Sequence, residues 1–313
     1  MKTPLSMLLI TSMLGISSNS WLFLWLMIEI NTPMFSFMLS STKENPKNPL
    51  NYFIIQSLTS LTMFIILIST MTKYPTTLSN KTLNISMHMI AFIKMGLMPT
   101  HNWMMNMMKS MKKTSLSTLM TVQKILPLKI TSMITTSQII QSILLMNLIL
   151  SSITIMQTTK TNHLLLMSSI HNISWTTLNI QSLTKISTLF FTIYSLMTIS
   201  LISNLSLTNK TSLNLPNKNS NINLIISIMA ISGLPPMWGF MSKFMMIQSM
   251  YLSNTPTLTL LTLLNSSILM LSGYLKLCYN MMMTNTKMKT KIPKNSPWLL
   301  ISNLISPSMI ILI

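Results

Sequence analysis

Residues 233–244, GLPPMWGFMSKF, interrupt an apolar run that extends from about Ile222 to Gln248. Each interruption is costly inside a membrane. Proline removes a backbone donor, glycine loosens the chain, and a lysine at bilayer depth is expensive. Their concentration in one segment predicts a discontinuous membrane helix in which Lys243 has a specific task.

The composition predicts an all-α polytopic membrane protein. The chain has 313 residues, a mean hydropathy of +0.53 and only 7% charged residues, whereas about 25% is usual in a soluble domain. Apolar runs long enough to span a bilayer recur along its whole length. No linker marks a second domain, so we expect residues 1–313 to form a single transmembrane domain.

The charge balance is strongly basic. The net charge is +19, all 21 basic residues are lysine, and the only acids are Glu29 and Glu44. A nucleic-acid partner is excluded, because the lysines lie at the ends of apolar segments and no groove-reading motif is present. Anionic lipids such as cardiolipin and acidic partner subunits are the expected counter-charges. The single cysteine, Cys278, excludes a disulfide and a Cys/His metal site, and the sequence predicts no nucleotide-binding loop.

About eleven transmembrane helices are predicted, and the lysines between them support this number. Thirteen loop lysines fall on one side of the membrane, and only Lys73, Lys81 and Lys185 fall on the other. By the positive-inside rule, the N-terminus is expected on the cytoplasmic or matrix side and the C-terminus on the opposite side. The predicted spans run near 4–17, 20–40, 51–72, 83–108, 115–135, 138–157, 162–182, 186–207, 221–249, 256–283 and 298–313.

The fourth and ninth predicted spans carry matching interruptions. Together they hold three of the five glycines. They are five spans apart, and an odd offset reverses direction in the membrane. The pattern therefore predicts two inverted five-helix halves, approximately 1–135 and 138–283, followed by an extra helix at 298–313. The predicted helix breaks are Gly96, Pro99, Pro127, Gly233, Pro235, Pro236 and Gly239.

Four ionisable residues lie well inside predicted spans: Glu29, Lys94, Lys124 and Lys243. Burial favours the neutral form of lysine, and a nearby carboxylate favours the charged form, so a lysine between these influences can load and release a proton. Glu29 is the expected partner of Lys94. His101 follows Lys94 by about two turns, on the same face if the helix continues. The simpler interpretations are a static ion pair and lysines that extend to the headgroups.

Several segments together resemble one family. GLPPMWGFMSKF (233–244), KMGLMPTHNW (94–103) and VQKILPL (122–128) are similar to signature segments of subunit 2 of mitochondrial NADH:ubiquinone oxidoreductase, an antiporter-like membrane subunit of respiratory complex I. SNSWLFLWLMIEIN (18–31) and SSIHNISW (168–175) follow the same order. The resemblance covers nearly the whole chain. The length of the chain is similar to that of the short animal form of this subunit.

The resemblance implies a proton-translocating subunit of the inner mitochondrial membrane, with the N-terminus on the matrix side and the C-terminus facing the intermembrane space. The family's glutamate–lysine pair falls on Glu29 and Lys94, its central and distal lysines on Lys124 and Lys243, and its histidine on His101. The chain would act in an enzyme only as a subunit. No cofactor is expected in it, since FMN, iron–sulfur clusters and ubiquinone would belong to partner chains among the other membrane-arm and accessory subunits.

The sequence also departs from the family. The acid expected near the end of the fourth span is Asn106, and a basic residue expected before SSIHNISW appears as His163. The family's histidine position holds Asn172, and His171 lies one residue earlier, about 100° around a helix. The family pattern therefore gives no support to a role for His171. The alternative functions are a stand-alone cation/proton antiporter subunit and a structural membrane scaffold whose polar residues only hold helices together.

Overall fold

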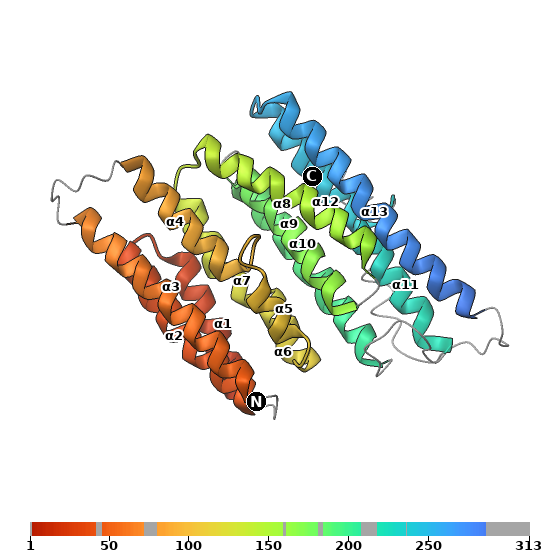
Figure 1. The fold of residues 1–313 in the computed structure, drawn as a ribbon, viewed down its shortest axis with the longest axis horizontal. Coiled ribbons are helices and arrows are strands. Elements are labelled where there is room, and N and C mark those ends of the chain that lie inside the picture. The colour runs from red at the N-terminus through yellow and green to blue at the C-terminus, as the bar shows by residue number, and fades with distance from the viewer. Residues whose placement is uncertain are drawn as a thin grey trace. The chain divides into compact units, whose positions relative to one another are not determined.

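A computed structural model of the chain describes residues 2–41, 46–71, 80–158, 161–180, 184–207, 218–235 and 237–285. Within these ranges the secondary structure is entirely α-helical (Figure 1), which confirms the predicted class. The helices are α1 (Lys2–Ser17), α2 (Trp21–Ser41), α3 (Lys47–Met71), α4 (Asn80–Met95), α5 (Asn102–Met108), α6 (Lys113–Met120), α7 (Val122–Met133), α8 (Gln138–Gln157), α9 (Thr161–Asn179), α10 (Thr184–Leu207), α11 (Lys218–Ser232), α12 (Trp238–Leu252) and α13 (Thr257–Asn285).

Five helices in the described part of the chain are long and apolar enough to cross a membrane: α2, α3, α8, α10 and α13. Three predicted spans each contain two shorter helices instead of one. The range 83–108 holds α4 and α5, the range 115–135 holds α6 and α7, and the range 221–249 holds α11 and α12. The last predicted span, 298–313, lies outside the described residues.

The chain forms two compact units, Met1–Ile143 and Leu144–Ile313, and the boundary falls within α8. In the first unit, α2 packs between α1 and α3, and α4 packs against α3 and α7 (Figure 1). In the second unit, α10 contacts α9, α11 and α12, and α11 also contacts α13. The core of the second unit includes the buried residues Leu148, Trp175, Phe190, Met246, Met250 and Leu263.

Serine and threonine are frequent inside these helices because their hydroxyls bond to the helix itself. Ser12 donates to the Leu9 carbonyl at 2.8 Å, and Ser227 donates to the Leu224 carbonyl at 2.8 Å. A hydroxyl satisfied in this way needs no water. Large apolar side chains remain exposed, for example Ile65 on α3 and Leu196 on α10. A polar sequence is thereby compatible with helices that face lipid.

Two glycines end helices in a backbone conformation that other residues rarely adopt. Gly96 follows α4 with φ of 69°, and Gly233 follows α11 with φ of 87°. Both values lie in the left-handed region, where a Cβ atom is unfavourable. Pro99 and Pro235 lie in the connections that follow these glycines. Pro236 lies outside the described residues.

Two predicted breaks are located elsewhere in the structure. Pro127 lies inside α7, and the interruption is at Thr121, whose φ of −116° departs from helical values. Membrane helices tolerate an internal proline where neighbouring groups satisfy the carbonyl that it leaves without a donor. Gly239 is the second residue of α12 and does not end a helix. It allows close packing instead, because a Cβ built there would lie 2.0 Å from the Ala230 carbonyl oxygen.

Replacing Gly239 by alanine should therefore force α12 away from α11. The obstructing atom belongs to the backbone and cannot rotate away, so we expect a loss of stability of about 1–3 kcal/mol. The measurement is the thermal unfolding temperature of the purified protein in its native assembly. Gly15→Ala is the control, because its Cβ would collide with a side-chain methyl group of Leu126 and not with backbone. Equal unfolding temperatures for both variants would contradict this account.

Candidate functional site

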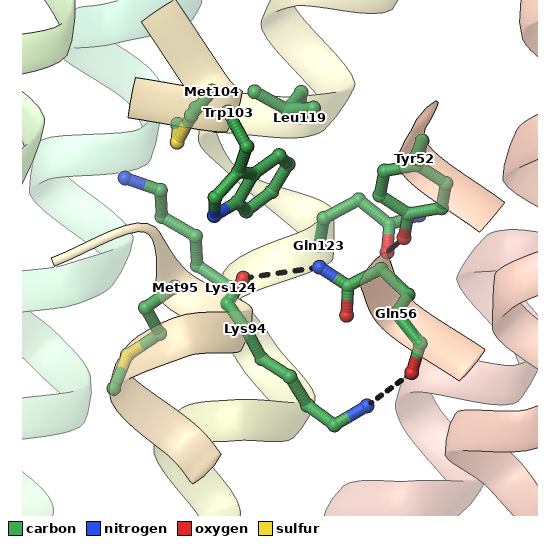
Figure 2. A pocket seen from close by; sticks show the side chains of 9 residues that line it. All are labelled: Tyr52, Gln56, Lys94, Met95, Trp103, Met104, Leu119, Gln123 and Lys124. Carbon is green, nitrogen blue, oxygen red and sulfur yellow. Dashed lines mark hydrogen bonds between the residues drawn. The ribbon is translucent and has the colours of Figure 1, made fainter. Parts of the chain in front are cut away.

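Lys94 lies at the end of α4 and is held by the neighbouring helix α3. Its ammonium donates to the Gln56 carbonyl oxygen at 3.2 Å, and the Gln56 side-chain amide donates back to the Lys94 carbonyl at 3.5 Å (Figure 2). The second bond reaches a carbonyl that has no partner within its own helix, because α4 ends at Met95. The helix end and the lysine are thus fixed by one residue.

Glu29 lies on α2 beside the same stretch of α3. Its Oε1 accepts a hydrogen bond from the Ser60 hydroxyl at 2.5 Å. Pro33 removes the helical donor for the Glu29 carbonyl, and the Thr32 hydroxyl supplies a replacement at 3.1 Å. The sequence pattern around Glu29 therefore includes a proline that our sequence analysis missed.

Glu29 and Lys94 do not form a direct ion pair in the structure. Glu29 is close enough to attract the Lys94 ammonium, but their nearest polar partners are Ser60 and Gln56. These two residues are four apart on α3 and so lie one turn apart on one face. Helix α3 therefore bridges the expected pair. The Ser60 hydroxyl contacts Glu29 and the Gln56 carbonyl contacts Lys94, whereas the two charged groups do not contact each other.

Lys124, on α7, is buried and its ammonium has no hydrogen-bond partner. It lines a cavity of about 10 Å³, close to the volume that one water molecule requires. Trp103 lines the same cavity, and its indole nitrogen is also buried without a partner. Figure 2 shows the Lys124 amine pointing away from Gln56, whereas the Lys94 amine points toward it. Two donors without acceptors make this cavity suited to water.

A neutral polar network continues from this cavity to α2 and α3. Gln123 accepts from the Asn31 amide at 2.9 Å and from the Tyr52 hydroxyl at 3.0 Å through the same side-chain oxygen. Tyr52 lies one turn before Gln56, which holds Lys94. Sequence reasoning overlooked these residues. The available signal was a polar side chain next to each charged one, Asn31 near Glu29 and Gln123 beside Lys124.

His101 does not continue the face of α4. The helix ends at Met95, and His101 precedes α5 as its N-cap residue. The condition for His101 to lie two helical turns from Lys94 on one face, a continuous helix, is not met, because the left-handed turn at Gly96 redirects the chain. The Nδ1 atom of His101 is buried without a hydrogen-bond partner.

In the second unit, Lys243 lies beside the connection between α11 and α12. Its ammonium donates to the carbonyl of Ser232, the last residue of α11, at 3.2 Å. A Cβ at Gly233 would lie 3.2 Å from this ammonium, so the glycine makes room for the lysine as well as turning the chain. Lys94, Lys124 and Lys243 are 5%, 2% and 7% exposed. None of them extends out of its unit, contrary to the headgroup interpretation.

His171, for which the family pattern gave no support, lies close enough to Lys243 for an electrostatic interaction. It is fully buried on α9, and its Nε2 accepts a hydrogen bond from the Trp175 indole at 3.0 Å. Asn172 is also buried on α9. Although the histidine is displaced by one residue relative to the family pattern, it still lies near Lys243.

No cluster of His, Cys, Asp or Glu that is able to hold a metal ion occurs in the described ranges.

No family model matches the chain. NADH-ubiquinone oxidoreductase chain 2 from Gallus gallus is 31% identical over 299 residues, which cover 88% of this chain and 84% of the relative.

Two solved structures share the fold. A chain of respiratory complex I from Thermus thermophilus superposes with a TM-score of 0.78 at 14% identity, covering 96% of this chain and 74% of its own. A chain of the Mrp complex from Dietzia gives a TM-score of 0.72 at 12% identity, covering 93% of this chain and 61% of its own. The identity to the Gallus gallus relative over most of both chains carries the assignment. The protein belongs to the family of NADH-ubiquinone oxidoreductase chain 2.

Proposed function

We propose that the protein is a proton-translocating membrane subunit of respiratory complex I in the inner mitochondrial membrane. The observation that carries the proposal is the unpartnered ammonium of Lys124 beside a water-sized cavity, within a chain of this family. Buried polar groups are normally hydrogen-bonded. An amine kept without a protein partner at this depth is poised to exchange a proton with internal water.

In this proposal, the groups around Lys94 pass a change of charge on to the Lys124 amine. Glu29 attracts the Lys94 ammonium, and α3 holds both groups through Ser60 and Gln56. Movement of α3 would change the environment of Glu29 and Lys94 together. Protonation of Glu29 removes the negative charge and favours loss of a proton from Lys94. Water in the adjoining cavity is the natural acceptor and leads on to Lys124.

In the second unit, Lys243 and His171 form the corresponding proton-handling pair. The Ser232 carbonyl stabilises the ammonium form of Lys243 by accepting its hydrogen bond. His171 lies nearby with Nε2 already engaged by Trp175. Nε2 is the only nitrogen of the neutral ring that can take a proton, so a proton arriving at His171 displaces the Trp175 hydrogen bond. The imidazolium that forms repels the Lys243 ammonium and favours release of its proton.

We also propose the membrane arrangement that the sequence predicts. The pairs α4–α5 and α11–α12 are the two halves of discontinuous spans, and α6–α7 is a third interrupted span. With 298–313 as the last crossing, the chain has eleven spans in two inverted halves, an N-terminus in the matrix and a C-terminus facing the intermembrane space. The uneven distribution of loop lysines supports this orientation.

The enzymatic role is that of a subunit. Flavin, iron–sulfur clusters and ubiquinone belong to other chains in this proposal, and this chain couples to their chemistry by conformational change. Its partners are other membrane-arm and accessory subunits, and its many lysines favour contact with anionic lipid such as cardiolipin.

The two alternative functions receive less support. A structural scaffold has no use for an unpartnered buried ammonium, because its burial without a hydrogen-bond partner costs free energy. A stand-alone antiporter would share the fold, as the Mrp likeness illustrates, but a likeness at 12% identity carries the fold alone. Purification distinguishes the antiporter: we expect this protein to co-purify with a large NADH-oxidising assembly, and recovery without one would favour the antiporter.

Replacing Lys243 by methionine should impair pumping. Methionine keeps the length and apolar stem but cannot carry a proton, so we expect protons translocated per NADH to fall by at least half in the assembled complex in vesicles. Lys276→Met is the matched control, because Lys276 is exposed on α13 and its amine reaches only the Met156 carbonyl. Unchanged pumping in the Lys243 variant would overturn the proposed function. Reduced assembly with unchanged pumping would support the scaffold.

Replacing Ser60 by alanine tests the bridge through α3. The Glu29 carboxylate would lose a buried hydrogen bond, an interaction worth about 1.5–3 kcal/mol when one partner is charged. We expect lower turnover and pumping than in the unaltered complex, with a smaller loss than in Glu29→Gln. Ser57→Ala, one turn away, removes a hydroxyl that donates to the Ile54 carbonyl and not to Glu29, so it should have no effect. The bridge would be refuted if the Ser60 and Ser57 variants behaved alike.

A further inference from the structure

A group of buried hydroxyls lies in the second unit, apart from Lys243. Ser168 and Ser169 lie on α9, Tyr194 lies on α10, and Tyr274 lies on α13. Each is at most 2% exposed. We call these four residues the hydroxyl cluster. It brings together hydroxyls from three different helices, so its polarity calls for an explanation.

The hydroxyl cluster has unused hydrogen-bonding capacity. Ser168 and Ser169 donate to the carbonyls of Leu165 and Leu166 at 2.9 and 2.6 Å, which leaves their oxygens free to accept. The Tyr194 hydroxyl approaches Ser169 and the Tyr274 hydroxyl approaches Ser168, and the two tyrosines are close enough to interact electrostatically. Neither tyrosine completes a hydrogen bond of ordinary geometry. Two donors and several acceptors thus converge without full pairing.

This arrangement suits a water molecule better than a dry core. A buried hydroxyl without a partner costs about 1–3 kcal/mol, and phenylalanine would fill the same space without that cost. A buried water typically makes 2–4 hydrogen bonds to polar groups that otherwise lack partners. The four hydroxyls of the cluster supply that number.

A cavity of about 20 Å³ lies on the same helices, one turn away. It is lined by Leu164, Leu165, Leu201 and Leu277, among others, and it reaches Thr161, the first residue of α9. Leu164 and Leu165 precede the two serines by four residues, so they lie on the same faces of α9. The cavity is almost wholly apolar, and such cavities stay dry. Water is therefore expected to be held at the hydroxyl cluster itself.

The other side of the hydroxyl cluster leads to Lys243. Ser168 precedes His171 by three residues, so the two side chains are neighbours on α9. His171 in turn interacts with Lys243. The cluster lies between this pair and the cavity that reaches Thr161.

We propose that the hydroxyl cluster of Ser168, Ser169, Tyr194 and Tyr274 binds water and extends the proton path from Lys243 and His171 along α9, as a branch of that path. This inference rests on the proposed function. Each hydroxyl accepts one proton on its oxygen and releases the proton that it held, so it ends unchanged. The bound water does the same, and no bond other than O–H and N–H forms or breaks.

The first test is direct. In a map of the complete complex at a resolution that shows internal water, we expect an ordered water within hydrogen-bond distance of both Tyr194 and Tyr274. That water should be absent in the Tyr194→Phe/Tyr274→Phe double variant. A dry hydroxyl cluster in the unaltered complex, in a map that shows water elsewhere, overturns the proposal. This readout holds even if the variants fail to assemble.

The second test is functional. In vesicles containing the complex, the double variant should lose at least half of the protons translocated per NADH, with NADH oxidation retained in uncoupled membranes. Tyr279→Phe, an exposed tyrosine on α13, should behave as the unaltered complex. If Lys243→Met abolishes pumping and the double variant does not, the hydroxyl branch fails and the proposed function stands. If Lys243→Met also pumps normally, the proposed function itself fails.

Discussion

The arrangement of this protein depends on how it satisfies polar groups where water is scarce. In a hydrocarbon environment each unsatisfied backbone or side-chain group costs several kcal/mol. Most hydroxyls in these helices meet that constraint locally by bonding to carbonyls of their own helix. The lysines meet it differently, with carbonyls in the case of Lys94 and Lys243. Lys124 does not meet it with any protein group, and that exception is what suggests function.

Interrupted helices supply both the space and the partners for these lysines. Where α11 ends, Ser232 presents a carbonyl that no helical amide claims, and Gly233 leaves room for the Lys243 side chain. Where α4 ends, the Lys94 carbonyl bonds to Gln56 and the Lys94 amine bonds back to the same residue. One glycine in the left-handed region follows each of these helix ends. Similar local chemistry thus recurs in the two units of the chain.

Neutral residues carry much of the connection between the charged ones. Gln56 and Ser60 hold Lys94 and Glu29, and Gln123 joins Asn31 to Tyr52 next to them. In the second unit, His171 and the hydroxyl cluster take a comparable place near Lys243. A relay of this kind uses groups that each donate and accept hydrogen bonds, so its direction is set by the charges at its ends rather than by its middle members.

The sequence by itself determined the helical class, the approximate positions of the uninterrupted helices and the turns at Gly96 and Gly233, because apolar periodicity and backbone restrictions are local properties. It also marked Glu29, Lys94, Lys124 and Lys243, since a charge in an apolar run stands out without any knowledge of its neighbours. Only the tertiary structure decided that α3 bridges Glu29 and Lys94, that His101 leaves the face of α4, and that His171 lies beside Lys243. These facts depend on which helices pack together, and neutral glutamines, serines and tyrosines reveal their partners only after that packing has brought distant segments into contact.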